Sequence, residues 1–241
     1  MRRVYSVSLL RALILVASAV LAASAFVPAQ AAAPAFVQIN SAVPQSTAAS
    51  SVSVTFTAAQ TAGNLNVVIV GWNDITANVS SLSDSAGNIY IRALGPTLGS
   101  GLSQSIYYAK NILGAAAGGN RVTISFSPAA VYPDVRILEY SGIDPINAVD
   151  VTAAGTGSST NSNSGAVQTG NANDLLVGAN IVFTSTNGPG TGYTNRVITY
   201  PNGDLAEDRV VTSTGSYSAV APLAALLKDK PTNCATRLLK S

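Results

Sequence analysis

A run of consecutive β-branched residues is the feature that most limits how this chain can fold. Residues 67–70, Val-Val-Ile-Val, are followed by Gly71 and lie inside the stretch 64–91, where a polar connection and further strand-like segments follow. The run is too short for a helix and too apolar for the edge of a sheet. It therefore predicts a central strand that is buried on both faces.

A turn motif, Asp-Ser-Ala-Gly-Asn, occupies residues 84–88. The carboxylate of Asp84 can accept hydrogen bonds from its own turn, and Gly87 can adopt a positive φ angle. We therefore interpret Asp84, Gly87 and Asn88 as structural turn residues, and we expect the strands on either side to pair as a hairpin. A metal-binding corner built from Asp84 and Asn88 is the alternative.

Candidate strands recur along the chain with turn residues between them, and no segment has helical periodicity. The candidates are residues 36–40, 51–57, 66–72, 79–83, 88–93, 103–110, 121–127, 134–140, 174–183, 195–200, 205–211 and 216–220. Their number predicts an all-β fold, an antiparallel two-sheet β-sandwich of jelly-roll type. The polar segment 155–165 divides the chain, and we expect a long surface loop there rather than a domain linker.

Part of the sequence pattern occurs twice. Residues 60–71 and 168–178 each place Gln, Thr, Gly and Asn before an apolar run that ends in glycine. The match predicts two related halves with one buried strand each, as suits a two-sheet sandwich.

The start of the chain has the three regions of a secretory signal peptide. Basic residues come first, residues 12–26 are apolar, and Ala29-Gln30-Ala31 is a cleavage site. We therefore expect a signal-peptide helix within residues 1–31, and a mature chain that is secreted or displayed at the cell surface. The apolar region is too short to span a bilayer, so we expect no membrane span in the mature chain.

The charge balance and the missing residue types exclude several classes of function. Three of the 13 basic residues lie in the leader, so the remainder carries 10 basic and 11 acidic residues and a net charge of −1. No basic patch indicates nucleic-acid binding. The chain has no His, which excludes Ser-His-Asp catalysis, and Cys234 is its one Cys, which excludes an internal disulfide. His- or Cys-ligated zinc is excluded on the same grounds.

The composition changes after residue 222. Residues 223–241 contain Lys and Leu clusters and Cys234, without strand alternation. We therefore divide the chain into a signal peptide (1–31), one β-sandwich domain (32–222) and a divergent, poorly packed tail (223–241), native or frame-shifted. A sandwich without a closing strand exposes a sheet edge, which favours self-association.

Four short motifs resemble a family of largely uncharacterised exported bacterial β-sandwich domains. They are SDSAGNIY at residues 83–90, YYAKNI at 107–112, EYSG at 139–142 and DLL at 174–176. The similarity covers roughly residues 36–222 and implies a sandwich fold, but it brings no catalytic residues to transfer. In the family an apolar closing strand follows the last hairpin, where this chain has its Lys-rich segment.

Carboxylates are the remaining candidates for site chemistry. Asp204, Glu207 and Asp208 form the densest acidic cluster, and oxygen-rich loops of this kind can bind Ca²⁺, the one cofactor that we consider. The alternative is a solvated turn with a Glu207–Arg209 ion pair, because strand alternation separates Asp208 from its neighbours. Glu139 lies among alternating apolar residues, so we expect a buried acid that needs a partner.

Aromatic side chains could form a platform for sugar rings, because flat aromatic faces complement the apolar faces of pyranoses. The candidates are Trp72, Tyr107, Tyr108, Tyr132, Tyr193 and Tyr200. The alternative is that most of them fill the core or the sheet surfaces.

We expect a non-enzymatic secreted or cell-surface module for binding or adhesion, with an extracellular polysaccharide or another surface protein as its partner. One alternative is a purely structural extracellular domain without a small ligand. Another is a carboxylate-dependent glycan hydrolase, which needs two facing acids about 5–10 Å apart.

Overall fold

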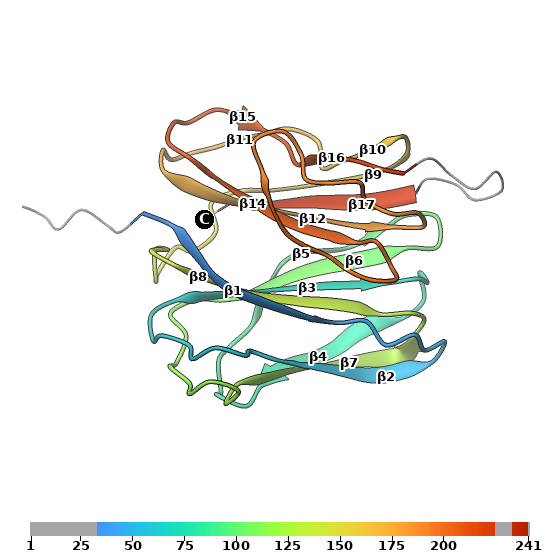
Figure 1. Ribbon diagram of the computed structural model, residues 1–241, viewed down its shortest axis with the longest axis horizontal. Helices are drawn as coiled ribbons and strands as arrows, with labels where there is room; N and C mark the ends of the chain where they lie inside the picture. Colours follow the sequence, from blue (N-terminus) through green and yellow to red (C-terminus); the bar gives the residue numbers. More distant parts are fainter. Residues whose placement is uncertain (1–32, 225–232, 241) are drawn as a thin grey trace, which may run out of the picture. The chain divides into compact units, whose positions relative to one another are not determined.

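The computed structural model describes residues 33–224 and the backbone of residues 233–240. This part of the chain is all-β, with antiparallel strands and no helix (Figure 1). The β-sandwich class predicted from the sequence is confirmed, whereas the jelly-roll connectivity stays a prediction. The expected signal-peptide helix lies outside the described residues.

A five-stranded sheet, which we call the central sheet, contains the strand that the sequence marks out. Its order is β1 (Ala35–Ala42), β8 (Asp134–Ser141), β3 (Leu65–Trp72), β6 (Ser103–Ala109) and β5 (Ile91–Leu98). Strand β3 is in the middle, and every one of its residues is buried. The prediction of a central strand buried on both faces is therefore confirmed.

One face of the central sheet is covered by a three-stranded sheet, the first outer sheet. Its order is β2 (Ala49–Thr55), β7 (Arg121–Ala130) and β4 (Asn78–Asp84). Val68 and Val70 of β3 pack there with Val122 and Ile124 of β7. These alternate residues point to one side of β3, as the period of a strand requires.

The opposite face of the central sheet is covered by a second five-stranded sheet, which we call the second-half sheet. Its order is β13 (Thr194–Ile198), β14 (Leu205–Val211), β12 (Asp174–Val182), β17 (Asn233–Lys240) and β9 (Thr152–Ser158). Val67 and Ile69 of β3 pack there with Leu175 and Val177 of β12. The sandwich therefore has three stacked sheets where the sequence predicted two (Figure 1).

The two five-stranded sheets have the same strand order, read from the first strand of each half. The first half gives β1-β8-β3-β6-β5, and the second gives β9-β17-β12-β14-β13. The repeated segment thus supplies the middle strand of each sheet. A residue with positive φ precedes both middle strands, Gly63 at 93° and Asn173 at 60°. These correspondences support two related halves, which pack against each other through their five-stranded sheets.

The two halves differ in what covers their far faces. The first half has the continuous first outer sheet, whereas the second half has two short ladders, which we call the outer cover. They are β10 (Asn161–Asn163) with β16 (Val220–Pro222), and β11 (Val167–Gln168) with β15 (Ser216–Tyr217). The outer layer of the second half is therefore thin.

The turn at residues 84–88 connects two sheets and does not close a hairpin. Strand β4 pairs with β7, and β5 pairs with β6, so the expectation that the flanking strands pair with each other is wrong. Gly87 has a φ of 84°. The Oδ2 atom of Asp84 accepts hydrogen bonds from Asn88 (2.8 Å), Tyr90 (2.9 Å) and Asn120 (2.9 Å). These bonds hold the chain as it crosses from the first outer sheet to the central sheet.

The polar segment 155–165 is not a long loop, because β9 and β10 occupy most of it. Its small residues permit close strand packing. A Cβ atom at Gly155 would lie only 2.4 Å from the carbonyl oxygen of Asn163, and thus too close for any other residue type there. A run of Gly, Ser and Asn that predicts a loop locally is here drawn into strands by tertiary packing.

The C-terminal segment also differs from our expectation that it has no strand. The backbone of β17 pairs with β12 from Val182–Cys234 to Leu176–Lys240, and with β9 on its other side. Without it, β12 and β9 would have unpaired backbone groups in the interior of the sheet. The packing of its side chains, and thus the predicted poor packing of the tail, stays a prediction.

Candidate functional site

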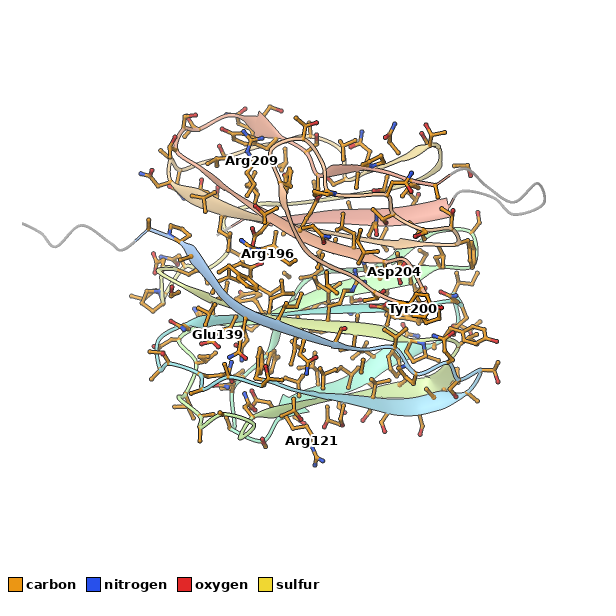
Figure 2. All side chains as sticks on the ribbon, in the orientation of Figure 1. Arg121, Glu139, Arg196, Tyr200, Asp204 and Arg209 are labelled. Atoms are coloured by element: carbon orange, nitrogen blue, oxygen red, sulfur yellow. The ribbon has the colours of Figure 1, made fainter. Side chains whose placement is uncertain are left out.

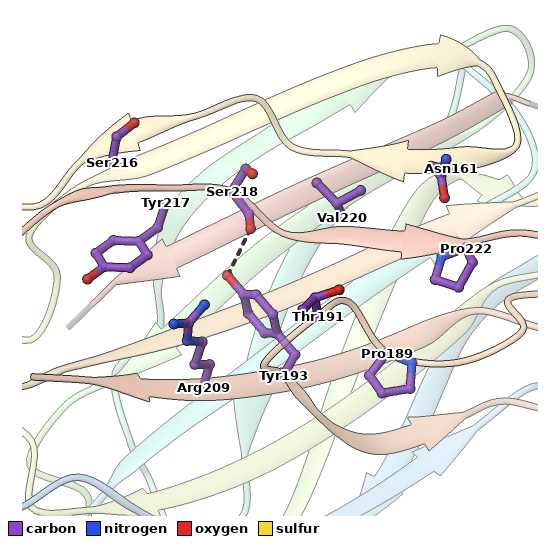
Figure 3. A pocket seen from close by; sticks show the side chains of 10 residues that line it. All are labelled: Asn161, Pro189, Thr191, Tyr193, Arg209, Ser216, Tyr217, Ser218, Val220 and Pro222. Carbon is purple, nitrogen blue, oxygen red and sulfur yellow. Dashed lines mark hydrogen bonds between the residues drawn. The ribbon is translucent and has the colours of Figure 1, made fainter.

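A pocket of about 490 Å³ opens in the outer layer of the second half, and we call it the first pocket. Side chains from separate elements line it (Figure 3). They include Asn161 of β10, Thr191 and Tyr193 before β13, Arg209 of β14, Tyr217 of β15, and Ser218. The lining combines two phenol rings, one guanidinium group, and hydroxyl and amide groups.

The pocket opens where the two halves differ. A tyrosine precedes the edge strand in each half, Tyr90 before β5 and Tyr193 before β13. The hydroxyl of Tyr90 donates to Asp84 and accepts from Asn66 (3.2 Å), in a closed polar network under the first outer sheet. The hydroxyl of Tyr193 instead donates to the carbonyl oxygen of Ser218 at 3.2 Å, under the thin outer cover (Figure 3). The thin outer cover leaves an open pocket beside Tyr193, whereas the polar network of Tyr90 occupies the corresponding place in the first half.

Arg209 lies in the pocket between a glycine and an aromatic ring. Its guanidinium carbon is 5.6 Å from the centre of the Tyr217 ring, within the range of a cation–π contact. A Cβ atom at Gly192 would lie 3.1 Å from Nη1 of Arg209, and Gly192 has a φ of 81°. The positive φ angle therefore favours glycine at position 192, and a larger residue there would shift the guanidinium of Arg209 by a few tenths of an ångström.

Glu207 is a buried acid that binds the backbone of the segment before Tyr193. Its Oε2 atom accepts a hydrogen bond from the backbone nitrogen of Gly190 at 2.7 Å. Gly178 of β12 leaves room for it, because a Cβ atom there would lie 2.9 Å from Cγ of Glu207. Burial raises the pKa of Glu207 to about 7, the Gly190 hydrogen bond opposes this shift, and the charge of Asp208 adds to it. The expected Glu207–Arg209 ion pair is not formed between these described side chains.

Tyr193 lies within the field of both charged groups. Burial raises the pKa of its hydroxyl, the nearby Glu207 carboxylate raises it further, and Arg209 lowers it. Tyr193 is therefore a neutral hydrogen-bond donor at any ordinary pH.

A second pocket of about 380 Å³ adjoins the first. The two share Asn161 of β10 and Val220 of β16, so they adjoin at the β10–β16 ladder. Thr156, Gly157 and Asn163 contribute to the second pocket. Together the pockets form a continuous hollow surface on the outer cover, with a more polar lining in the first pocket than in the second.

The six aromatic candidates do not form one platform. Trp72 and Tyr107 lie in the core between the central sheet and the first outer sheet, and Tyr108 packs on the opposite face of the central sheet. Tyr193 lines the first pocket, whereas Tyr200 is 92% exposed in the turn after β13 (Figure 2).

Tyr132 is the sixth candidate, and it is half-buried with a φ of 44° in the loop before β8. Sequence reasoning missed Tyr217 and Asn161, which lie in very short strands. It considered Arg209 only as a partner of Glu207. The glycine-rich residues 188–192 were the one local signal near this site.

The three acids proposed for calcium point to different places. Asp204 is buried, and its Oδ1 atom accepts from the backbone nitrogen of Val182 at 2.8 Å. Asp208 pairs with Arg196, with Nε 2.7 Å from Oδ2, and Glu207 accepts a hydrogen bond from the backbone nitrogen of Gly190. Within the described residues, no group of three potential ligands is placed to bind a metal ion. The structure therefore does not bring the predicted calcium cluster together.

Asp204 belongs to a buried charged group between the central and second-half sheets. Burial raises its pKa well above the usual range, the negative charge of Asp134 acts in the same direction, and Arg136 opposes both. Asp134 and Arg136 form an ion pair in which both side chains are fully buried. These charges connect the two halves and do not reach the first pocket, whose lining they do not join.

Glu139 is a fully buried acid with hydrogen-bond partners on three segments. It accepts from the side-chain amides of Gln38 and Asn64, each at 2.6 Å, and from the backbone nitrogen of Thr61 at 3.3 Å. These donors satisfy the carboxylate, so its place in the structure is explained by packing between β1, β8 and the segment before β3.

Comparison with protein-family models, with curated proteins and with solved structures finds no match to this chain. Among the described residues, no helix is long and apolar enough to cross a membrane.

Proposed function

We propose that this chain is a secreted, non-enzymatic binding module that takes a glycan in the first pocket. The observation that carries the proposal is the lining, where Tyr193 and Tyr217 lie beside hydroxyl, amide and guanidinium groups. Sugar rings present apolar C–H faces and a rim of hydroxyl groups, which aromatic rings and short polar side chains complement. A volume of about 490 Å³ is in the range of small-ligand sites.

The adjoining second pocket supports a chain-like ligand over a single sugar. Asn161 reaches both pockets, and its amide can donate to one sugar unit and accept from the next. A polysaccharide that lies across the β10–β16 ladder would occupy both spaces.

Retention on polysaccharide gels tests the proposal. Residues 32–241 are run through native gels that contain neutral or acidic polysaccharides, and Tyr217→Ala is compared with the unchanged chain. We expect Tyr217→Ala to be retained less, because the free energy of binding should weaken by about 1–3 kcal/mol, a typical contribution of a binding aromatic residue. Tyr200→Ala is the matched control, because Tyr200 is exposed in a turn and lines neither pocket.

The outcome separates the proposal from its alternatives. Equal retention of both variants on every glycan would show that the first pocket does not bind the glycan. No retention of the unchanged chain would favour a purely structural domain. Release of reducing ends from a bound glycan would show a hydrolase and contradict the non-enzymatic part.

Export is tested separately, because the leader lies outside the described residues. The sequence predicts cleavage after Ala31. Intact-mass measurement of the protein from the culture medium or cell surface should show a chain that begins at Ala32. Recovery of the full-length chain in the cytoplasm would contradict secretion.

A further inference from the structure

We infer that the glycan is acidic, and that Arg209 binds its carboxylate or sulfate group in the first pocket. This inference rests on the proposed function and specifies the chemical class of the ligand.

The guanidinium of Arg209 has no anionic partner in the described part of the chain. The ion pairs among the described side chains are Asp134–Arg136 and Arg196–Asp208. The guanidinium of Arg209 contacts the ring of Tyr217, and this contact leaves its N–H donors available. Arg136 and Arg196, by contrast, each use their donors inside the fold.

The N–H donors of Arg209 are accessible from the first pocket. Arg209 is partly exposed and lines the pocket, so an incoming group reaches it without crossing the core (Figure 3). Gly192 on one side and Tyr217 on the other limit where the planar group can lie. A fixed, planar fork of donors binds a carboxylate or a sulfate with two parallel hydrogen bonds, which a neutral hydroxyl cannot accept as well.

Two acids of β14 precede Arg209 in the sequence and could cancel its positive charge, but Asp208 pairs with Arg196, which leaves Glu207. Its carboxyl group is buried and accepts a hydrogen bond from Gly190, away from any ion pair with Arg209. Burial raises its pKa, which favours the neutral form. Arg209 therefore has no ion pair with either acid of β14, and a neutral sugar that covered the guanidinium would leave its charge unpaired.

Arg121 is an exposed arginine that lacks this setting. Arg121 lies on β7 in the first outer sheet, away from both pockets (Figure 2). It carries the same charge and is exposed to water, where a single charge attracts an anion only weakly. Arg121 therefore serves as the matched control for Arg209.

The test measures affinity for three polymers of related sugars: polygalacturonate, which carries carboxylates, a sulfated galactan, and a neutral galactan. We expect the unchanged chain to prefer one acidic polymer, and Arg209→Gln to weaken that binding by about tenfold or more while binding to the neutral polymer stays the same. Arg209→Lys keeps the charge and should give an intermediate loss. Arg121→Gln should change neither affinity.

The outcomes are distinct. Preference for polygalacturonate identifies a carboxylate as the anion, and preference for the sulfated polymer identifies a sulfate ester. Equal affinity for neutral and acidic polymers, or an unchanged preference in Arg209→Gln, would overturn the inference and leave glycan binding in place. Failure of the unchanged chain to bind any of the three polymers would contradict the proposed function and the inference that rests on it.

Thermal melting shows whether Arg209→Gln is folded. If Arg209→Gln is unfolded, the affinity of the unchanged chain for the acidic polymer is measured at about 50 and about 500 mM salt instead. The higher salt concentration should weaken an ionic contact and leave a neutral contact unchanged. A salt-independent affinity would then overturn the inference.

Discussion

The Nη1 atom of Arg136 in β8 donates a hydrogen bond to the carbonyl oxygen of Leu205 in β14, at 2.6 Å. The same atom donates to the carbonyl oxygen of Asn180 in β12, at 3.0 Å. A side chain of the central sheet thus binds the backbone of two strands in the second-half sheet. Its Nε lies 2.8 Å from Oδ1 of Asp134, so the buried charge is balanced. This arginine joins the two halves of the sandwich.

Replacing Arg136 by Met should destabilise the fold by about 3–5 kcal/mol, because it leaves the buried carboxylate of Asp134 without its ion-pair partner and removes the hydrogen bonds to Asn180 and Leu205. Urea unfolding of the purified protein measures the loss. The double variant Asp134→Asn with Arg136→Met should recover part of it, since the remaining charge is removed. Arg121→Met, at an exposed position, should change stability by no more than about 0.5 kcal/mol. A similarly small change for Arg136→Met would show that the charge does not hold the halves together.

Gly87→Val should destabilise the fold by about 1–3 kcal/mol, because a β-branched residue is strained at positive φ. The φ angle of Gly87 is 84°, and a Cβ atom there would meet no described atom within 4 Å, so the cost comes from the backbone. Gly157→Val is the control, because Gly157 has open space around a Cβ among the described residues but lies in β9 without positive φ. Equal melting temperatures for the two variants would refute the turn geometry.

The central strand was predictable because its signal is local. Four consecutive β-branched residues can hardly lie anywhere but between two layers, and β3 does. The number of layers was not predictable in the same way. It depends on which face of β3 meets β12, and sequence patterns carry no information on that pairing.

The candidate site was predicted only in part, for a physical reason. Tyr193 was on the list of aromatics, but Asn161 and Tyr217 come from strands of three and two residues, too short for any periodicity. The pocket results from the thin outer cover, which is a relation between distant segments. The turn at residues 84–88 shows the same limit. Asp84 and Gly87 determine the bend locally, whereas the pairing of β4 with β7 and of β5 with β6 depends on strands that are distant in sequence.

The backbone amides of β17 should exchange with solvent as slowly as those of β12, because each lies between two paired strands. Hydrogen exchange with mass spectrometry or NMR on residues 32–241 measures this directly. The amide of Tyr200, in an exposed turn, provides the fast reference. Exchange of the segment 233–240 at the rate of that turn would mean that the C-terminal segment is the poorly packed tail that its composition predicts.

Gly157→Phe should block the second pocket and leave the first pocket open. Gly157 lines the second pocket, and a side chain there extends into free space among the described residues. We expect affinity for a long polysaccharide to fall by about tenfold, and affinity for a short oligosaccharide that fills one pocket to stay the same. Ser53→Phe, on the exposed side of β2, controls for an added aromatic ring. Equal losses for long and short ligands would contradict two adjoining subsites.

The stability of the fold should fall as pH rises from about 4.5 to about 7, and Glu207 should account for part of the fall. The folded protein raises the pKa of Glu207 from an ordinary 4.5 to about 7, mainly through burial. In that window the folded chain keeps a proton that the unfolded chain has lost. The raised pKa therefore stabilises the fold fully below about pH 4.5, and this stabilisation is lost as pH rises to about 7. Above about pH 7 Glu207 adds no further pH dependence.

Glu207→Gln removes this contribution, because the amide oxygen can still accept the hydrogen bond of Gly190 and carries no proton to lose. Between about pH 4.5 and 8 the unchanged chain should lose about 1–3 kcal/mol more stability than the variant does. Asp204, whose pKa is also raised by burial, is present in both chains, so its contribution cancels in the comparison. Urea unfolding across this pH range measures the difference. Parallel stability curves for the two chains would mean that Glu207 is already ionised in the folded protein.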